Sequence, residues 1–149
     1  VTVKGATTLS GRLVERFGTP IEKPPIEGLT ASFPSPKTLV EADLESIGLP
    51  KTRAAAIRRL AGAVVEGELA LAPSGDVETS LRRLGRLPGV GDWTAQYIAM
   101  RALGEPDGFP ASDLGLKHAM PGVDLAARAE KWRPWRSYAA LHLWASLND

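Results

Sequence analysis

Residues 87–95 read Leu87-Pro88-Gly89-Val90-Gly91-Asp92-Trp93-Thr94-Ala95 and join two segments of helical periodicity. Two glycines two positions apart let the backbone turn sharply and come close to a bulky group. Because a helix begins directly after them, the amides of Gly89, Gly91 and their neighbours face outward at a positive helix end, which suits a phosphate. A plain helix–helix turn would use the same Gly and Pro, but the flanking Leu-Pro and Trp-Thr-Ala favour binding of a DNA backbone. Such a contact positions DNA without reading its sequence.

Helical patterns also extend away from this turn on both sides. The predicted helices cover residues 5–17, 51–66, a segment capped by Asp76, 92–103, and shorter segments that begin at Asp113, at Asp124 and at Pro134, the last running through Trp144. Ser35 and Asp43 are predicted to cap two short turns between the first two helices, and Gly48 to end the second. Residues 19–35 and 105–112 are rich in Pro and Gly and are predicted loops. Nothing alternates with period two, so the prediction is an all-α, multi-helix fold of about eight helices.

Composition narrows the function further. The 149 residues suit one domain, and 44% hydrophobic residues can bury a core. The balance of 18 Lys+Arg against 17 Asp+Glu excludes a polybasic arm, although it permits a local basic face. The absence of Cys excludes thiol chemistry, cysteine zinc sites and iron–sulfur clusters, and two His at no metal-ligand spacing disfavour a histidine metal site. No apolar run reaches the roughly 18 residues of a membrane span, so we expect a cytoplasmic protein.

The turn and its downstream residues resemble the helix–hairpin–helix (HhH-GPD) DNA glycosylases. In that superfamily a hairpin containing L-P-G-V-G is followed about 20 residues later by a catalytic Asp, here Asp113 within Gly108–Lys117. The sequence is most similar to the bacterial 3-methyladenine DNA glycosylase II (AlkA) type, through Gly91–Tyr97 and Ala129–Tyr138 and the following His142-Leu143-Trp144. The resemblance implies a hairpin at about 77–103, a catalytic loop at 105–118 and C-terminal helices at 124–147. It also implies base excision repair in a bacterial, nucleoid-associated protein.

The resemblance implies that Asp113 is the catalytic carboxylate. Breaking an N-glycosidic bond builds positive charge on the deoxyribose ring, which a fixed carboxylate stabilises while it orients the attacking water. Asp is also a common helix cap, so Asp113 can serve both purposes. Asp107, inside the same loop, is the nearest rival for the catalytic role.

Trp93 stands where bifunctional members of the superfamily carry a catalytic lysine. A lysine amine can form a Schiff base with the sugar and go on to cleave the strand, whereas an indole cannot. The resemblance therefore implies a monofunctional hydrolase that excises alkylated purines and leaves an abasic site. Lys117, four residues after Asp113, is expected to face DNA or solvent.

Trp93, Tyr97 and Trp144 match residues that wall the base pocket in the resembling enzymes. A purine alkylated at N3 or N7 is positively charged, and aromatic rings attract it by cation–π interactions of roughly 0.5–2 kcal/mol. The two remaining tryptophans, Trp132 and Trp135, are predicted core residues. Leu114 departs from the family pattern, which has an aromatic residue after the catalytic Asp.

The expected partner is double-stranded DNA that contains alkylated bases, bound by a monomer without a membrane. DNA contacts are predicted at the hairpin and on the next helix, at Gly89, Val90, Gly91, Thr94 and Lys117. The backbone carbonyls of Gly85, Leu87 and Val90 match those that hold a monovalent cation, Na or K, in related hairpins, and no other cofactor is implied. Arg133 and Arg136 flank Pro134 and are expected to be structural.

The sequence begins Val1-Thr2-Val3 without Met, and we expect it to be a piece of a longer polypeptide. By the resemblance, the wedge residue that fills the gap left by a flipped base lies just upstream, as does a small β-rich N-terminal domain. Base flipping costs a few kcal/mol, and the wedge residue helps to meet that cost. The piece without it is therefore expected to be weakly active on duplex DNA.

Two alternatives to the hydrolase remain. A non-catalytic helix–hairpin–helix module would bind DNA backbone but would need neither Asp113 nor the aromatic residues. A bifunctional glycosylase/lyase for oxidised bases is disfavoured by Trp93 and by the absence of Cys.

Overall fold

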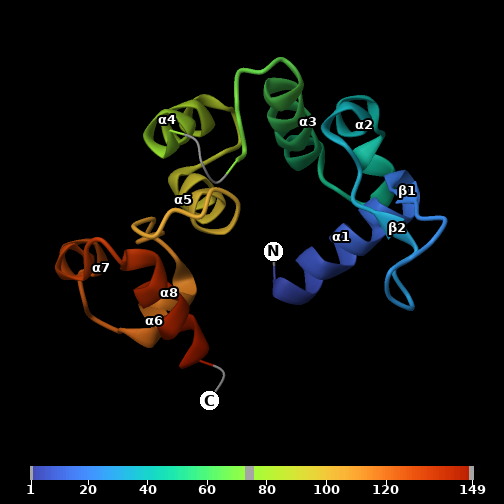
Figure 1. The fold of residues 1–149 in the computed structure, drawn as a ribbon. Helices are drawn as coiled ribbons and strands as arrows, with labels where there is room; N and C mark the ends of the chain where they lie inside the picture. Colours follow the sequence, from blue (N-terminus) through green and yellow to red (C-terminus); the bar gives the residue numbers. More distant parts are fainter. Residues whose placement is uncertain (1, 73–75, 148–149) are drawn as a thin grey trace. The chain divides into compact units, whose positions relative to one another are not determined.

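The computed structural model describes residues 2–72 and 76–147. They form two compact units, an N-terminal unit that ends at Glu68 and a C-terminal unit that begins at Leu69. The N-terminal unit contains α1 (Val3–Phe17), β1 (Thr19–Pro20), β2 (Ala31–Ser32), α2 (Pro36–Glu41), the 3-10 helix η1 (Leu44–Ile47) and α3 (Lys51–Val65). The C-terminal unit contains α4 (Val77–Arg86), α5 (Asp92–Arg101), α6 (Leu114–Ala119), α7 (Leu125–Ala129), the 3-10 helix η2 (Glu130–Trp132) and α8 (Arg136–Ala145) (Figure 1).

The helical prediction is confirmed, with one addition in the segment expected to be a loop. Two strands of two residues each pair antiparallel within 19–35, with Thr19 opposite Ser32 and Pro20 opposite Ala31. Strands this short carry no detectable alternation of apolar and polar residues, so the pairing could not be predicted from the sequence. Gly18 is needed where α1 meets this ladder, because a Cβ there would lie 2.4 Å from the Val14 carbonyl oxygen.

Buried apolar side chains from α1, η1, α3 and the residues on either side of η1 form the core of the N-terminal unit: Leu13, Ala42, Leu44, Ile47, Leu49 and Ala54. Ser35 caps α2 as predicted, because its side chain accepts from the Thr38 amide. Asp43 was predicted to cap η1, but its side chain makes no capping bond. Instead the Ser46 hydroxyl donates to the Asp43 carbonyl at 2.6 Å, and Gly48 ends the turn at φ +92°.

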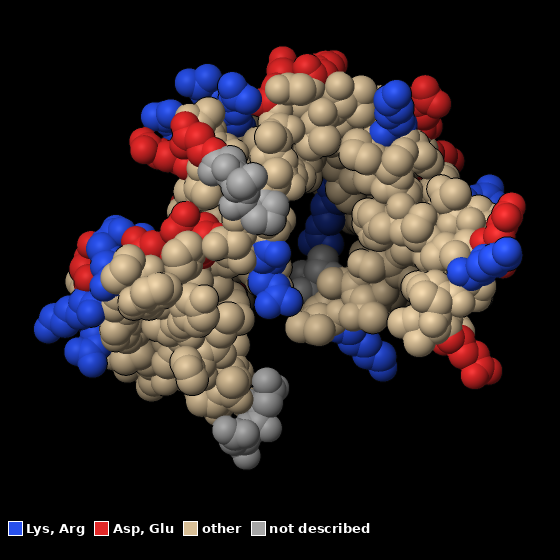
Figure 2. Space-filling model, viewed as in Figure 1, with Lys and Arg blue, Asp and Glu red and all other residues tan. Residues whose placement is uncertain are grey.

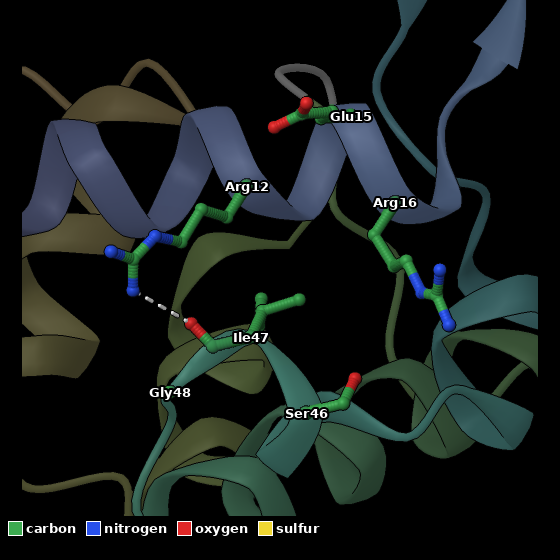
Figure 3. A pocket seen from close by; sticks show the side chains of 6 residues that line it. All are labelled: Arg12, Glu15, Arg16, Ser46, Ile47 and Gly48. Carbon is green, nitrogen blue, oxygen red and sulfur yellow. Dashed lines mark hydrogen bonds between the residues drawn. The ribbon is translucent and has the colours of Figure 1, made fainter.

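Arginine side chains connect the elements of this unit. The Arg12 guanidinium donates to the Ile47 carbonyl at 3.2 Å, which joins α1 to the end of η1. Arg12 and Arg16 extend from α1 towards η1 and line an open pocket of about 500 Å³ there, with Ser46 opposite them (Figure 3). Arg58 on α3 donates to the Ala42 carbonyl at 2.9 Å, which holds the start of η1 against α3.

The core of the C-terminal unit gathers residues from the loop between α5 and α6 and from α6, α7 and α8: Phe109, Leu116, Leu125, Ala129 and Ala140. Trp132 packs against it, with its ring edge-on to Phe109 at 5.9 Å, as predicted. The prediction is wrong for Trp135, which is 58% exposed and lies edge-on to exposed Tyr138. Because α8 begins at Arg136 rather than at Pro134, Trp135 precedes the helix instead of lying on its buried face.

Charged side chains of both signs are intermixed on the face shown in Figure 2, in keeping with 18 basic and 17 acidic residues in the sequence. None of the helices formed by residues 2–72 and 76–147 has the length and apolar character needed to cross a membrane.

Candidate active site

The predicted hairpin is formed by α4, the turn at 87–91 and α5. Asp76 caps α4 through a bond from the Thr79 amide at 3.0 Å, and Leu84 near the end of α4 is fully buried. In the turn, the Val90 amide donates to the Leu87 carbonyl at 3.0 Å. The hairpin therefore lies where the sequence predicted it, although α5 ends at Arg101, two residues early.

The two glycines of the turn have different requirements. Gly89 has φ +94°, a conformation that other residues rarely adopt. Gly91, the N-cap of α5, has φ −85°, and a Cβ there would meet no atom within 4 Å. The fold thus requires glycine at 89 but not at 91. No acceptor in the described part of the chain takes up the amides of Asp92 and Trp93, so both amides remain available to an anion.

Asp113 receives hydrogen bonds from three different elements. Its Oδ1 accepts from the Leu116 amide at 2.9 Å and from the Trp144 indole Nε1 at 2.8 Å. Its Oδ2 accepts from the Trp93 indole Nε1 at 2.7 Å. Trp93 lies two residues after Gly91, so α5 links the hairpin turn directly to this carboxylate.

Asp113 is therefore more than a helix cap. Asp76 and Asp124 cap α4 and α7 in the same unit, and their caps use an amide, with a threonine hydroxyl added at Asp76. Asp113 makes the equivalent amide bond for α6 and in addition accepts from two indoles. Capping does not require the two indole donors, so their convergence sets this carboxylate apart.

The Asp113 carboxylate is held in its ionised form. Burial raises the pKa of its carboxyl group, but hydrogen bonds, chiefly those from Trp144, Leu116 and Trp93, outweigh burial and bring the pKa below its usual value of 3.8. The group is therefore an anion at neutral pH. It can stabilise a nearby positive charge but cannot supply a proton to a leaving group.

The three aromatic residues predicted to wall the pocket lie together beside Asp113. Trp93 and Tyr97, one turn apart on α5, are stacked with ring centroids 5.1 Å apart at 14°. Tyr97 and Trp144 of α8 are 6.0 Å apart and tilted. Trp93 is 39% exposed and Tyr97 37%, so a flat ligand can reach them. Leu114, directly after Asp113, is 70% exposed.

Asp107, the rival carboxylate, is engaged elsewhere. It forms ion pairs with Arg133 and with Arg136, the latter at 2.8 Å. Its side chain is 18% exposed, as is that of Arg136. Because both guanidiniums contact this carboxylate, Asp107 is part of a structural network that fastens the loop between α5 and α6 to the start of α8. Arg133 and Arg136 are accordingly structural, as predicted.

Two further side chains hold the loop, and sequence reasoning gave them no role. The Ser137 hydroxyl lies 2.6 Å from the Glu105 carbonyl and 2.8 Å from the Gly108 carbonyl, and it donates to this pair. The Gln96 side-chain oxygen of α5 accepts from the Phe109 amide at 3.1 Å. Ser137 lies in the stretch that carries the family resemblance, but the residue types alone do not reveal these contacts.

The other predicted DNA and cation contacts lie on the same hairpin and on α6. Lys117 is exposed on α6, and Thr94 is half-buried in the first turn of α5. Of the carbonyls predicted to hold a cation, that of Leu87 already accepts from Val90. The roles of Gly85, Leu87 and Val90 as cation ligands stay a prediction.

Relatives of known sequence match nearly the whole chain, whereas no family model matches it. The probable bifunctional transcriptional activator/DNA repair enzyme AlkA of Mycobacterium tuberculosis is 43% identical over 99% of this chain and 31% of its own length. DNA-3-methyladenine glycosylase 2 of Escherichia coli is 38% identical over 97% of this chain and 52% of its own length. The chain thus spans about a third to a half of the curated relatives it matches.

Solved structures share the fold. The 3-methyladenine DNA glycosylase of Archaeoglobus fulgidus has a TM-score of 0.81 at 24% identity and covers 97% of this chain and 53% of its own. The Mag1 glycosylase of Schizosaccharomyces pombe, solved with abasic DNA, has a TM-score of 0.73 at 20% identity over 97% of this chain and 72% of its own. Identity with the curated relatives over almost the full chain, together with this shared fold, shows that the chain belongs to the HhH-GPD DNA glycosylase superfamily and is similar to its DNA-3-methyladenine glycosylase II members.

Proposed function

We propose that this chain is the catalytic part of a monofunctional DNA glycosylase. The substrate is a purine alkylated in the 3-methyladenine manner, and hydrolysis of its N-glycosidic bond leaves an abasic site in base excision repair. The observation that carries the proposal is the ionised Asp113 carboxylate, bonded by two indoles of an accessible aromatic cluster directly after the hairpin turn. Neither a simple cap nor a simple DNA-binding turn requires that arrangement.

Asp113 acts by electrostatic stabilisation of the sugar. As the bond between the sugar and the base breaks, positive charge develops on the deoxyribose ring, and a fixed carboxylate lowers the energy of that state. Oδ1 accepts two hydrogen bonds and Oδ2 accepts one, so Oδ2 retains capacity to face the sugar or to accept from the attacking water. The indoles fix the carboxylate in advance, so the carboxylate does not have to reorient as the bond breaks.

The aromatic cluster accounts for the substrate class. Because Asp113 stays ionised, it does not protonate the departing base, and the base must leave readily by itself. A purine with a positive charge from alkylation does so, and the exposed rings of Trp93 and Tyr97 attract that charge. Neutral, undamaged purines lack both properties.

The same geometry favours hydrolysis over lyase chemistry. Trp93 donates an indole N–H to Asp113 from the place where bifunctional members carry lysine, and an indole forms no Schiff base. A DNA-binding module without activity would leave the indole contacts to Asp113 without a purpose.

Duplex DNA is the proposed partner, and the hairpin turn is its proposed backbone contact. We expect Gly91→Ala to change the free energy of unfolding by no more than about 1 kcal/mol but to weaken DNA binding, because the methyl group occupies space that is open in the free protein. Gly89→Ala should instead destabilise the fold by about 1–2 kcal/mol through its positive φ. Urea denaturation and fluorescence anisotropy on a labelled duplex measure the two effects. Unchanged DNA affinity in Gly91→Ala would show that the phosphate binds elsewhere.

The activity is tested with the full protein that contains this chain. Methylated DNA serves as the substrate, free bases are separated by chromatography, and abasic sites are detected by alkaline cleavage. We expect release of 3-methyladenine and abasic sites without strand cleavage by the protein. DNA binding without base release would favour the non-catalytic module, whereas a covalent adduct trapped by borohydride would favour the lyase.

A further inference from the structure

Gly115 lies directly beside the hydrogen bond between Asp113 and Trp144. A Cβ at this position would be 3.0 Å from Asp113 Oδ1, 3.1 Å from Trp144 Cδ1 and 3.2 Å from Trp144 Nε1. These separations are tighter than nine in ten real contacts of a Cβ, so a side chain here would displace the indole or the carboxylate by a few tenths of an ångström and disturb the bond. The bond itself measures 2.8 Å.

The backbone gives no reason for glycine at this position. Gly115 lies inside α6, and it is not among the glycines with positive φ. Gly115 is the second residue of α6, so it neither ends the helix nor forms a turn there. Gly62 in α3 has open space around its Cβ position, so a helical glycine in this chain does not in general mark a close approach.

The Trp144 indole beside Gly115 takes part both in the aromatic cluster and in the hydrogen bonding of the Asp113 carboxylate. Trp144 comes from α8, and its ring is packed against Tyr97 while its N–H bonds Asp113. The Leu116 amide also bonds Oδ1, but that bond only satisfies the cap of α6. The Trp144 bond therefore adds a second constraint from a separate element and ties the carboxylate to the aromatic cluster.

We propose that Gly115 is a positioning residue, which admits the Trp144 indole so that its N–H fixes the orientation of the Asp113 carboxylate. The inference rests on the proposed function for its catalytic consequence. With Oδ1 held by α6 and α8 and Oδ2 by α5, the carboxylate cannot rotate about its χ2 angle without breaking an indole bond. The free lone pair of Oδ2 then stays directed towards the place where a sugar binds against the aromatic rings.

A double-mutant cycle in the full protein tests this coupling. Trp144→Phe keeps an aromatic ring but removes the donor, and a bond to a charged acceptor is commonly worth a rate factor of roughly ten or more. Gly115→Ala is expected to slow single-turnover base release by roughly three- to tenfold through the same bond. The double variant should be no slower than Trp144→Phe alone, because both substitutions act on one interaction. The affinity for DNA should not change.

Gly62→Ala is the matched control, since it makes the same change in a helix where the methyl group meets nothing. It should release base at the rate of the unaltered protein. A wild-type rate in Gly115→Ala, or a double variant whose losses multiply, would overturn the positioning role.

A measurement that needs no activity separates this inference from the proposed function. In the ¹⁵N-labelled protein, each of the four tryptophans of this chain gives one indole N–H signal. Those of Trp93 and Trp144 are expected downfield because both donate to a carboxylate, and Gly115→Ala should shift the Trp144 signal upfield while sparing Trp93. An upfield shift of the Trp144 signal, in a protein that releases no base, would support the role of Gly115 and overturn the glycosylase proposal. Base release together with an unshifted Trp144 signal would support the glycosylase proposal and overturn the role of Gly115.

Discussion

Replacing Asp113 by Asn should lower single-turnover release of 3-methyladenine by at least about a hundredfold, since comparable losses follow removal of one electrostatic contact to a transition state. An amide cannot neutralise positive charge on the sugar, and its NH₂ group would face one of the two indole donors. The helix remains capped, because Asn accepts the Leu116 amide as well as Asp does. Base release is measured by chromatography, with DNA affinity and circular dichroism showing that the variant is folded and still binds.

Asp124→Asn provides the matched control for this change. Asp124 caps α7 in the same unit through an amide bond and is exposed. This variant should retain full activity. If Asp113→Asn released base as fast as the unaltered protein, the catalytic carboxylate would have to lie elsewhere.

Asp107→Ala should give the opposite pattern. The free energy of unfolding should fall strongly, whereas the rate of base release by the folded variant should change little. Removing one partner of a buried ion pair costs about 3–5 kcal/mol, and the greater exposure of Arg133 reduces this to about 2–4 kcal/mol here. The Ser137 contacts to the loop carbonyls remain, so Asp113 stays in place when the variant is folded. Urea denaturation gives the stability, and base release is measured at a temperature where the variant is native.

Glu78→Ala tests whether the loss is specific to this network. Glu78 pairs with Arg82 one turn away on α4, and both side chains are mostly exposed. Such a pair contributes about 0.2–1 kcal/mol. Loss of base release in a folded Asp107→Ala protein would restore Asp107 as a candidate for the catalytic carboxylate.

Much of the fold could be predicted because its signals are local. Ser35 and Asp76 are followed by helical patterns, and their side chains bond amides three residues later. Gly89 adopts a positive φ that its own turn imposes. Asp43 shows the limit of such signals. The Ser46 hydroxyl and Gly48 complete the η1 turn, and the Asp43 side chain makes no capping bond.

The parts that sequence reasoning missed depend on partners far along the chain. The sequence favours Asp113 over its rival Asp107 in the same loop, but it does not reveal what Asp107 does. That depends on Arg136, 29 residues from Asp107. Trp135 is a large aromatic residue of the kind that cores contain, but α8 begins two residues later than predicted, and Trp135 is exposed. No local pattern encodes either outcome.

The amino-acid sequence by itself determined the helical class, the hairpin turn and the placement of Asp113 at the start of a helix, because each follows from residues within a few positions of one another. Tertiary structure alone decided that Trp93 and Trp144, which lie 20 and 31 residues from Asp113, would both donate to it. Side-chain directions over such separations are set by the packing of α5, α6 and α8, and a linear pattern contains no information on that packing.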